Sequence, residues 1–280
     1  MNASNEIRSG ARFEFGDNWA RFLDDLTEER IAEAELSLRE MLDVDRLNGL
    51  RFLDIGSGSG LFSLAARRLG ASAHSFDFDP QAVACTQELK RRYFPEDERW
   101  SVEQGSALDR DYMQSLGQFD VVYSWGVLHH TGAMWLGFEN AIRRVMDVDG
   151  KLYVAIYNDQ GWKSHLWWFV KFFYNRLPRL LRTPYVATVS AFTHLAIIIK
   201  YTIKLKPMTA ITPLIRDKRV RGMSAKHDRF DWIGGFPYEF AAFDTLTEYF
   251  QSRGFSVINA NRSTSLGCHE LVLKHTACVD

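Results

Sequence analysis

The sequence has few cysteines, few prolines and no long uninterrupted apolar run. Its 280 residues include three cysteines, Cys85, Cys268 and Cys278, and seven prolines. Three widely spaced cysteines without a C-x-x-C pair argue against a disulfide framework or a cysteine zinc site, and they favour a reduced, cytoplasmic protein. The first 15 residues have no apolar core, so they predict neither a secretory signal nor a membrane anchor.

Acidic residues are nearly absent from one part of the chain. Residues 160–229 contain 14 Lys/Arg and 2 Asp/Glu, a net charge of +12, whereas the remainder contains 20 Lys/Arg and 33 Asp/Glu, a net charge of −13. This separation says nothing about the fold, but it predicts that the basic segment meets an anionic molecule or a lipid surface.

Short apolar runs alternate with helical patterns along most of the chain. This alternation predicts an α/β fold with a doubly wound, mostly parallel, seven-stranded sheet of the Rossmann-like kind. Thr245 and Glu248 fit a capping box for a helix that stops at Gly254. The strands are predicted at 51–55, 73–77, 100–103, 119–124, 151–157, 255–260 and 270–274, and other helices at 27–42, 61–69, 80–93 and 137–145.

Glycines at alternate positions, Gly56, Gly58 and Gly60, follow the first predicted strand. Glycines allow a sharp turn and let a ligand approach the bare backbone. A dinucleotide fingerprint would need another glycine where this chain has Leu61, which disfavours a dinucleotide-dependent oxidoreductase. Asp77 ends the second predicted strand, where a carboxylate can accept hydrogen bonds from both hydroxyls of a ribose.

The G-x-G-x-G spacing, with Asp54 two residues ahead of it, resembles the first motif of the class I S-adenosylmethionine-dependent methyltransferases. The stretches 127–130 and 141–150 make the chain similar to the branch of small-molecule methyltransferases that includes the quinol O-methyltransferases of ubiquinone biosynthesis. This resemblance covers roughly 50–160 and 240–275. It implies that the cofactor is S-adenosyl-L-methionine.

The resemblance also implies positions for the cofactor. The methionine part should lie at the glycine loop, the ribose at Asp77, the adenine near Phe78, Ser106 and Ala107, and the sulfur above the end of the fourth strand. The predicted cofactor-binding residues are Asp54, Gly56, Ser57, Gly58, Gly60, Asp77, Phe78, Ser106, Ala107, Ser124 and Trp125. The glutamates that can bind a divalent ion in this branch are replaced here by Gly126 and His129, so no metal is predicted.

Methyl transfer to a weakly acidic hydroxyl needs a base near the methyl group, and histidine titrates near neutral pH. The sequence offers two candidates, His130 after the fourth strand and His227 after the basic segment. His129 and Asp231 are their neighbours and are predicted to contact the substrate. Trp19 is also predicted to do so, because related enzymes fold an N-terminal segment over the site.

The basic segment interrupts the alternation after the fifth strand. We therefore expect an N-terminal helical segment at 1–48, a methyltransferase core made of 49–159 and 232–280, and an inserted α-helical cap at 160–231. Aromatic and basic residues are interleaved in 162–181, and 183–199 has no charge but is too short to span a bilayer. The cap is predicted to be a lid over a hydrophobic acceptor, a surface for anionic membranes through 160–207, or both.

The acceptor is predicted to be a small, partly hydrophobic molecule that is methylated at oxygen. Nitrogen or sulfur acceptors remain alternatives, as does a non-catalytic, membrane-associated protein that retains the fold. Nucleic acid is disfavoured, because no D/N-P-P-Y/F motif follows the fourth strand. We expect a cytoplasmic protein that can associate peripherally with a membrane.

Overall fold

The computed structural model describes residues 6, 9, 11–13, 22–23, 26–203 and 232–276. Within these residues a seven-stranded sheet has the order β3-β2-β1-β4-β5-β7-β6. Strands β1 to β5 are parallel, and β7 is antiparallel to both β5 and β6. The strands are β1 (Arg51–Ile55), β2 (Ser72–Asp77), β3 (Trp100–Gln104), β4 (Val121–Trp125), β5 (Lys151–Tyr157), β6 (Phe255–Asn261) and β7 (Cys268–His275). The predicted fold class is confirmed.

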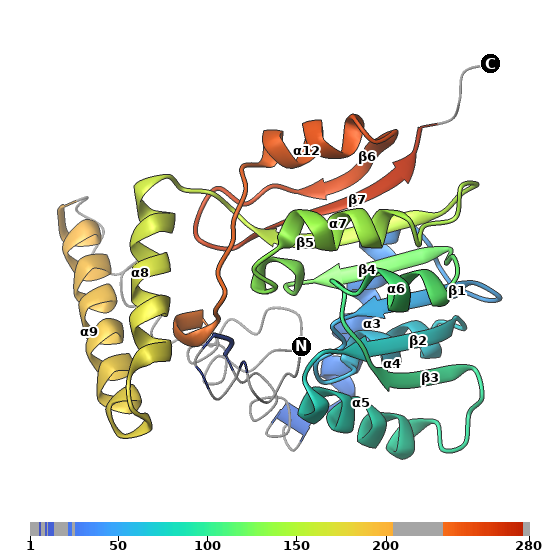
Figure 1. Cartoon of the computed structure of the whole chain (residues 1–280), viewed down its shortest axis with the longest axis horizontal. Coiled ribbons are helices and arrows are strands. Elements are labelled where there is room, and N and C mark those ends of the chain that lie inside the picture. Colours follow the sequence, from blue (N-terminus) through green and yellow to red (C-terminus); the bar gives the residue numbers. More distant parts are fainter. Residues whose placement is uncertain are drawn as a thin grey trace.

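Helices cover both faces of the sheet (Figure 1). A parallel sheet enclosed in this way needs strands that are apolar on both sides, and β5 is buried throughout from Leu152 to Ile156. One face packs against α3 (Glu28–Leu42), α4 (Leu61–Arg68) and α5 (Pro80–Tyr93). The other packs against α6 (Arg110–Ser115), α7 (Met134–Ile142) and α12 (Phe243–Gln251).

Helix starts with a local cap agree with the sequence. The Thr27 hydroxyl accepts a hydrogen bond from the backbone N–H of Arg30, so Thr27 caps α3 at the predicted start of the helix. The Asp79 side chain accepts from the N–H of Gln81, and Pro80 occupies the first position of α5.

The predicted capping box of α12 is wrong. The helix begins at Phe243 after an extended Ala242 that provides no side-chain cap, which places Thr245 and Glu248 inside the helix. The helix starts early because Leu246 and Phe250 are the side chains that reach the core, and one more turn is needed ahead of them. Helix α6, a single short element, was not predicted.

The segment after β5 forms two helices, α8 (Trp162–Arg176) and α9 (Arg179–Ile203), which extend to one side of the sheet (Figure 1). They meet the rest of the chain through a separate apolar cluster, in which Phe13, Tyr174, Val186 and Ile233 are buried. No helix in the described parts of the chain is both long enough and apolar enough to cross a membrane.

Candidate active site

A cavity of about 640 Å³ lies where the parallel strands end. Open α/β sheets bind their ligands at this edge, outside the carboxyl ends of the strands. Its lining comes from the loops after β1, β2, β3 and β4, from the end of β5, from β7, and from positions 12, 13 and 232. The cavity therefore joins a glycine-rich end to an aromatic end.

The glycine loop admits no larger residue at its first position. Gly56 has φ +76, and a Cβ there would lie 2.4 Å from a methyl carbon of Val127. Gly56, Ser57 and Gly58 line the cavity with bare backbone or a short side chain. Gly60 does not line it. This residue precedes α4 with φ +82, and a Cβ would meet Thr86 of α5 at 2.9 Å, so its role is close packing.

Asp77 is fixed by the backbone on both carboxylate oxygens. Oδ2 accepts from the N–H of Gly58 at 3.0 Å, and Oδ1 accepts from the N–H of Asp79 at 2.9 Å. Burial raises the pKa of Asp77 to about 6, against these hydrogen bonds, which lower it. Each oxygen keeps a second lone pair, so the carboxylate can receive the two hydroxyls of a ribose.

Asp54 belongs to a buried polar chain beneath the loop. The Ser63 hydroxyl donates to its Oδ2 at 2.5 Å and lies 2.6 Å from the Ser75 hydroxyl, which accepts from Nε1 of Trp100 at 2.9 Å. Burial raises the pKa of Asp54 to about 7. Asp54 borders the cavity, yet its known partner is Ser63, so its position suits support of the loop.

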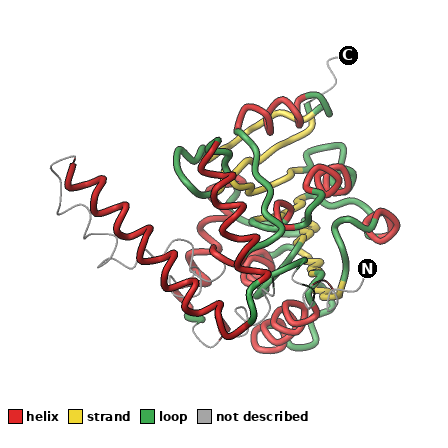
Figure 2. The backbone as a smooth tube through the Cα atoms, turned by 60° about the vertical axis from the view of Figure 1, so that its left-hand side comes forward, coloured by secondary structure: helices red, strands yellow, loops and turns green. Residues whose placement is uncertain are grey.

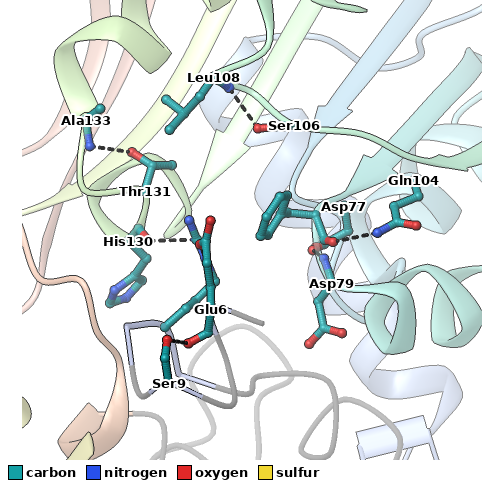
Figure 3. Close-up of polar contacts among 12 residues, drawn as sticks. Glu6, Ser9, Asp77, Asp79, Gln104, Ser106, Leu108, His130, Thr131 and Ala133 are labelled. Carbon is teal, nitrogen blue, oxygen red and sulfur yellow. Dashed lines mark hydrogen bonds and ion pairs between the residues drawn. The ribbon is translucent and has the colours of Figure 1, made fainter. Parts of the chain in front are cut away.

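The predicted adenine residues line the cavity together with an arginine that the sequence did not single out. The guanidinium of Arg12 lies 4.7 Å from the centre of the Phe78 ring and donates to the backbone oxygen of His130 at 2.9 Å. Ser106 accepts from the N–H of Leu108 at 3.2 Å through its hydroxyl. Asp77 and His130 lie on opposite sides of the cavity, and Ser106 lies apart from both (Figure 3). Ala107 also lines the cavity.

The end of β4 meets a carboxylate that the sequence reasoning missed. Nε1 of Trp125 donates to Oε1 of Glu270 at 3.2 Å, and the Tyr153 hydroxyl donates to Oε2 at 2.9 Å. Both Trp125 and Glu270 line the cavity, whereas the fully buried Ser124 does not and donates instead to the backbone oxygen of Ile55. An acid directly before the apolar run 271–273 was the available signal.

Residues 237–241, here called the strap, contact residues of the aromatic end. The N–H of Glu239 donates to the backbone oxygen of His129 at 2.9 Å, and its carboxylate accepts from the N–H of Met134, the first residue of α7, at 3.1 Å. The N–H of Ala241 donates to the backbone oxygen of Tyr157 at 3.0 Å. The strap thus joins the 3-10 turn η1 (Leu128–His130), α7 and β5.

The two adjacent histidines have different surroundings. His130 lines the cavity, and its Nδ1 lies 2.6 Å from the strap oxygen of Pro237, so Nδ1 carries the proton. Burial, with the charge of Lys171, lowers the pKa of His130 to about 3. His129 is fully buried against Tyr157, accepts from its N–H at 3.3 Å and does not line the cavity. A direct substrate contact for His129, as predicted, does not fit this position.

A buried lysine on α8 holds the aromatic wall of the cavity. The ammonium of Lys171 donates to the backbone oxygen of Trp232 and lies 4.8 Å from the ring centres of Trp232 and Tyr238 and 5.6 Å from that of Tyr157. Tyr157 and Trp232 line the cavity. Three further predicted site residues, Trp19, His227 and Asp231, lie outside the described residues.

The site offers a fit for a nucleoside sulfonium. Bare backbone at 56–58, the ribose-type carboxylate of Asp77 and the aromatic face of Phe78 suit S-adenosylmethionine. In the parts of the chain that the structure describes, no group of three His, Cys, Asp or Glu side chains is placed to hold a metal ion.

Known proteins share part of this sequence and the fold. Residues 53–152 match the family model for a methyltransferase domain. The fold is similar to the magnesium protoporphyrin IX methyltransferase of Synechocystis PCC 6803 with bound SAH, with a TM-score of 0.52 and 14% identity over 92% of both chains. It is also similar to PKMT2 of Rickettsia typhi, with a TM-score of 0.60 and 12% identity over 87% of this chain and 52% of that one.

The chain therefore carries a methyltransferase domain at 53–152, on a Rossmann-like fold similar to that of solved methyltransferases. Among curated proteins, the chain is 48% identical over 54 residues to the ribosomal protein L11 methyltransferase of Methylococcus capsulatus, covering 19% of this chain and 18% of that protein. A second match, to the same enzyme of Xanthomonas campestris, is 43% identical and covers 19% and 21%. The chain thus spans about a fifth of the length of these relatives.

Proposed function

We propose that the chain transfers the methyl group of S-adenosylmethionine to an oxygen of a small, partly hydrophobic molecule. The observation that carries this proposal is the continuity of the cavity from the glycine loop to an aromatic end at Trp125, Tyr157 and Trp232. An acceptor between these rings would present its polar atom to the region of the sulfonium. Binding pockets combine apolar walls with a few placed polar groups in the same way.

The chain's own residues would divide the work by position. The loop 56–58 and Asp77 would fix the cofactor, which supplies an electrophilic methyl group when bound. Transfer is an in-line displacement, so holding the acceptor oxygen in line contributes much of the rate. The aromatic wall, held by Lys171, would exclude water and orient the acceptor.

We propose Glu270 as the residue that takes the acceptor's proton. The acceptor oxygen would form a bond to the methyl carbon as the carbon–sulfur bond breaks, releasing S-adenosylhomocysteine, and the hydroxyl proton would pass to Glu270. Its carboxylate lines the cavity and is held by two neutral donors. His130 stays the alternative that the sequence predicted, and its low pKa suits orientation of the hydroxyl better than proton uptake. His227 also remains a prediction.

The first test is calorimetric titration with S-adenosylmethionine, S-adenosylhomocysteine and NADH. We expect the first two ligands to bind and NADH not to bind, with binding reduced at least about tenfold in Asp77→Ala. Release of S-adenosylhomocysteine is then assayed with quinols, catechols and phenols. Failure of every small acceptor would reject the small-molecule proposal.

The proton acceptor is tested with matched variants on the acceptor found in that screen. Glu270→Gln should lower kcat roughly 100-fold or more, the usual effect of losing a general base, while the affinity for S-adenosylhomocysteine stays within about twofold. His130→Gln should act mainly on KM. A normal kcat in Glu270→Gln, with a large loss in His130→Gln, would return the role to the histidine.

A protein acceptor is the second candidate. It is supported by the 54-residue match to the ribosomal protein L11 methyltransferase of Methylococcus capsulatus. Methyl transfer to purified L11, with no transfer to any small acceptor, would favour it.

A further inference from the structure

Helix α8 has two opposite faces with different surroundings. Trp167, Lys171 and Tyr174 face the apolar cluster around Ile233 and the cavity wall, and Lys171 and Tyr174 are buried. Trp162, Leu166, Phe169 and Phe173 are 71%, 52%, 54% and 57% exposed. Successive residues of an α-helix turn by about 100°, so these four form one stripe, on the side opposite Lys171. The helix that walls the acceptor end thus turns an apolar stripe to the outside.

Helix α9 carries similar exposed side chains. Phe192, Leu195 and Ile199 recur at helical spacing and are 68%, 52% and 51% exposed. The later part of α9 extends away from the sheet and its helices (Figure 2). Apolar surface of this extent on a helical projection marks a site of interaction.

The charge of the two helices indicates the kind of partner. Residues 160–203 contain Lys and Arg but no Asp or Glu. Lys163 and Arg176 are exposed, and both lie on helix α8 beside the stripe. Aromatic side chains flanked by bases are typical of helices that lie in the boundary between lipid headgroups and acyl chains. A protein partner would have to offer acidic side chains to these bases and an apolar groove to the stripe. The two helices contain no acidic side chain, so a second copy of the chain could not pair with their bases through the same surface.

We infer that the outer face of α8, continued by the exposed side chains of α9, docks on an anionic bilayer surface. Trp162, Leu166, Phe169 and Phe173 enter the headgroup boundary, while Lys163 and Arg176 contact lipid phosphates. Trp167 on the inner face of α8 lies 5.6 Å from the ring centre of Trp232, which lines the acceptor end of the cavity. Docking therefore brings that end to the membrane. The idea that a hydrophobic acceptor enters the cavity from the membrane rests on the proposed function, whereas the docking itself does not.

The test is cosedimentation of the full chain with vesicles of phosphatidylcholine and phosphatidylglycerol, and with phosphatidylcholine vesicles alone. Binding should require the anionic lipid and weaken as salt is raised. The variant Phe169→Ser/Phe173→Ser should weaken binding at least about tenfold, because each lost side chain removes buried apolar area. Quenching of tryptophan fluorescence by brominated lipid should be smaller in Trp162→Phe.

The matched control is Leu36→Ser/Ile258→Ser, which removes two apolar side chains of similar exposure, 48% and 47%, from other elements. It should bind vesicles as the unmodified chain does. Circular dichroism and titration with S-adenosylhomocysteine show that each variant is folded. No binding to anionic vesicles, or equal binding by Phe169→Ser/Phe173→Ser, would overturn the inference. The inference would also be overturned if Phe169→Ser/Phe173→Ser changed the molar mass of the protein in solution but bound vesicles normally. The face would then be a contact between two copies of the chain.

Discussion

Asp54 and Asp77 end neighbouring strands, and burial raises the pKa of both, yet their hydrogen bonds differ. Asp77 receives backbone N–H groups on both oxygens and borders the cavity, so it can be ionised and still accept from a ligand. Asp54 receives the hydroxyl of Ser63 within a buried chain of side chains. The two carboxylates therefore differ in role: Asp77 is placed to bind a ligand, and Asp54 supports the loop.

Cofactor affinity should depend on pH through Asp77. Ribose hydroxyls donate to the ionised carboxylate, and its pKa is raised to about 6 in the free protein. The Kd for S-adenosylhomocysteine should therefore be flat above about pH 7 and rise toward roughly tenfold per pH unit well below pH 6. Calorimetry across this range checks the prediction. In Asp77→Asn, binding should be weak and nearly independent of pH; a normal slope in that variant would assign the effect to another group.

Asp54→Asn should stabilise the free protein at alkaline pH. The pKa of Asp54 is raised to about 7, so the folded state holds its proton more tightly than the unfolded state, and ionisation lowers stability as the pH rises from about 4 to 7. Asparagine accepts from Ser63 without a charge. Urea unfolding should show a gain of roughly 2 to 4 kcal/mol at pH 8 and little change at pH 4. A loss of stability at pH 8 would mean that the carboxylate, rather than an acceptor oxygen, is required.

At the scale of elements, helix starts separate what a sequence can and cannot predict. Thr27 and Asp79 cap their own helices from adjacent positions, and both starts were predicted. Helix α7 has no cap at Ala133 and begins at Met134, three residues before its predicted start. Its partner is the carboxylate of Glu239, more than 100 residues later in the chain. A cap that comes from a distant residue leaves no pattern in the sequence near the helix start.

Removing that distant cap should destabilise the fold. Glu239→Ala leaves the first N–H groups of α7 without a carboxylate, and the loss should be about 1 to 2 kcal/mol in urea unfolding. Glu248→Ala is the matched control, because Glu248 is exposed within α12 and its predicted capping box is absent. Equal stability of the two variants would show that α7 does not depend on the strap.

For the whole molecule, the sequence predicted the sheet and many of the residues that line the glycine-loop end of the cavity, but few of those at its aromatic end. The strands and the glycine loop depend on neighbours in the sequence, such as Gly56 and Asp77 at their motif spacing. Arg12, Lys171 and Glu270 belong to three distant segments. Each meets its partners, Phe78, Trp232 and Trp125 among them, only in the folded chain. The sequence predicted that both His129 and His130 face the substrate, but only His130 lines the cavity.

The strap has a consequence for the local stability of the elements that it joins. Its backbone and the Glu239 side chain bond to η1, to the start of α7 and to the end of β5, so releasing it breaks contacts in three elements together. Such linked contacts exchange their amide protons as one cooperative unit. Amides at 129–134 and 238–241 should therefore share one opening free energy, below that of the central strands, in native-state hydrogen exchange. The residues around His129 and His130 would then open and close as one unit, rather than one contact at a time.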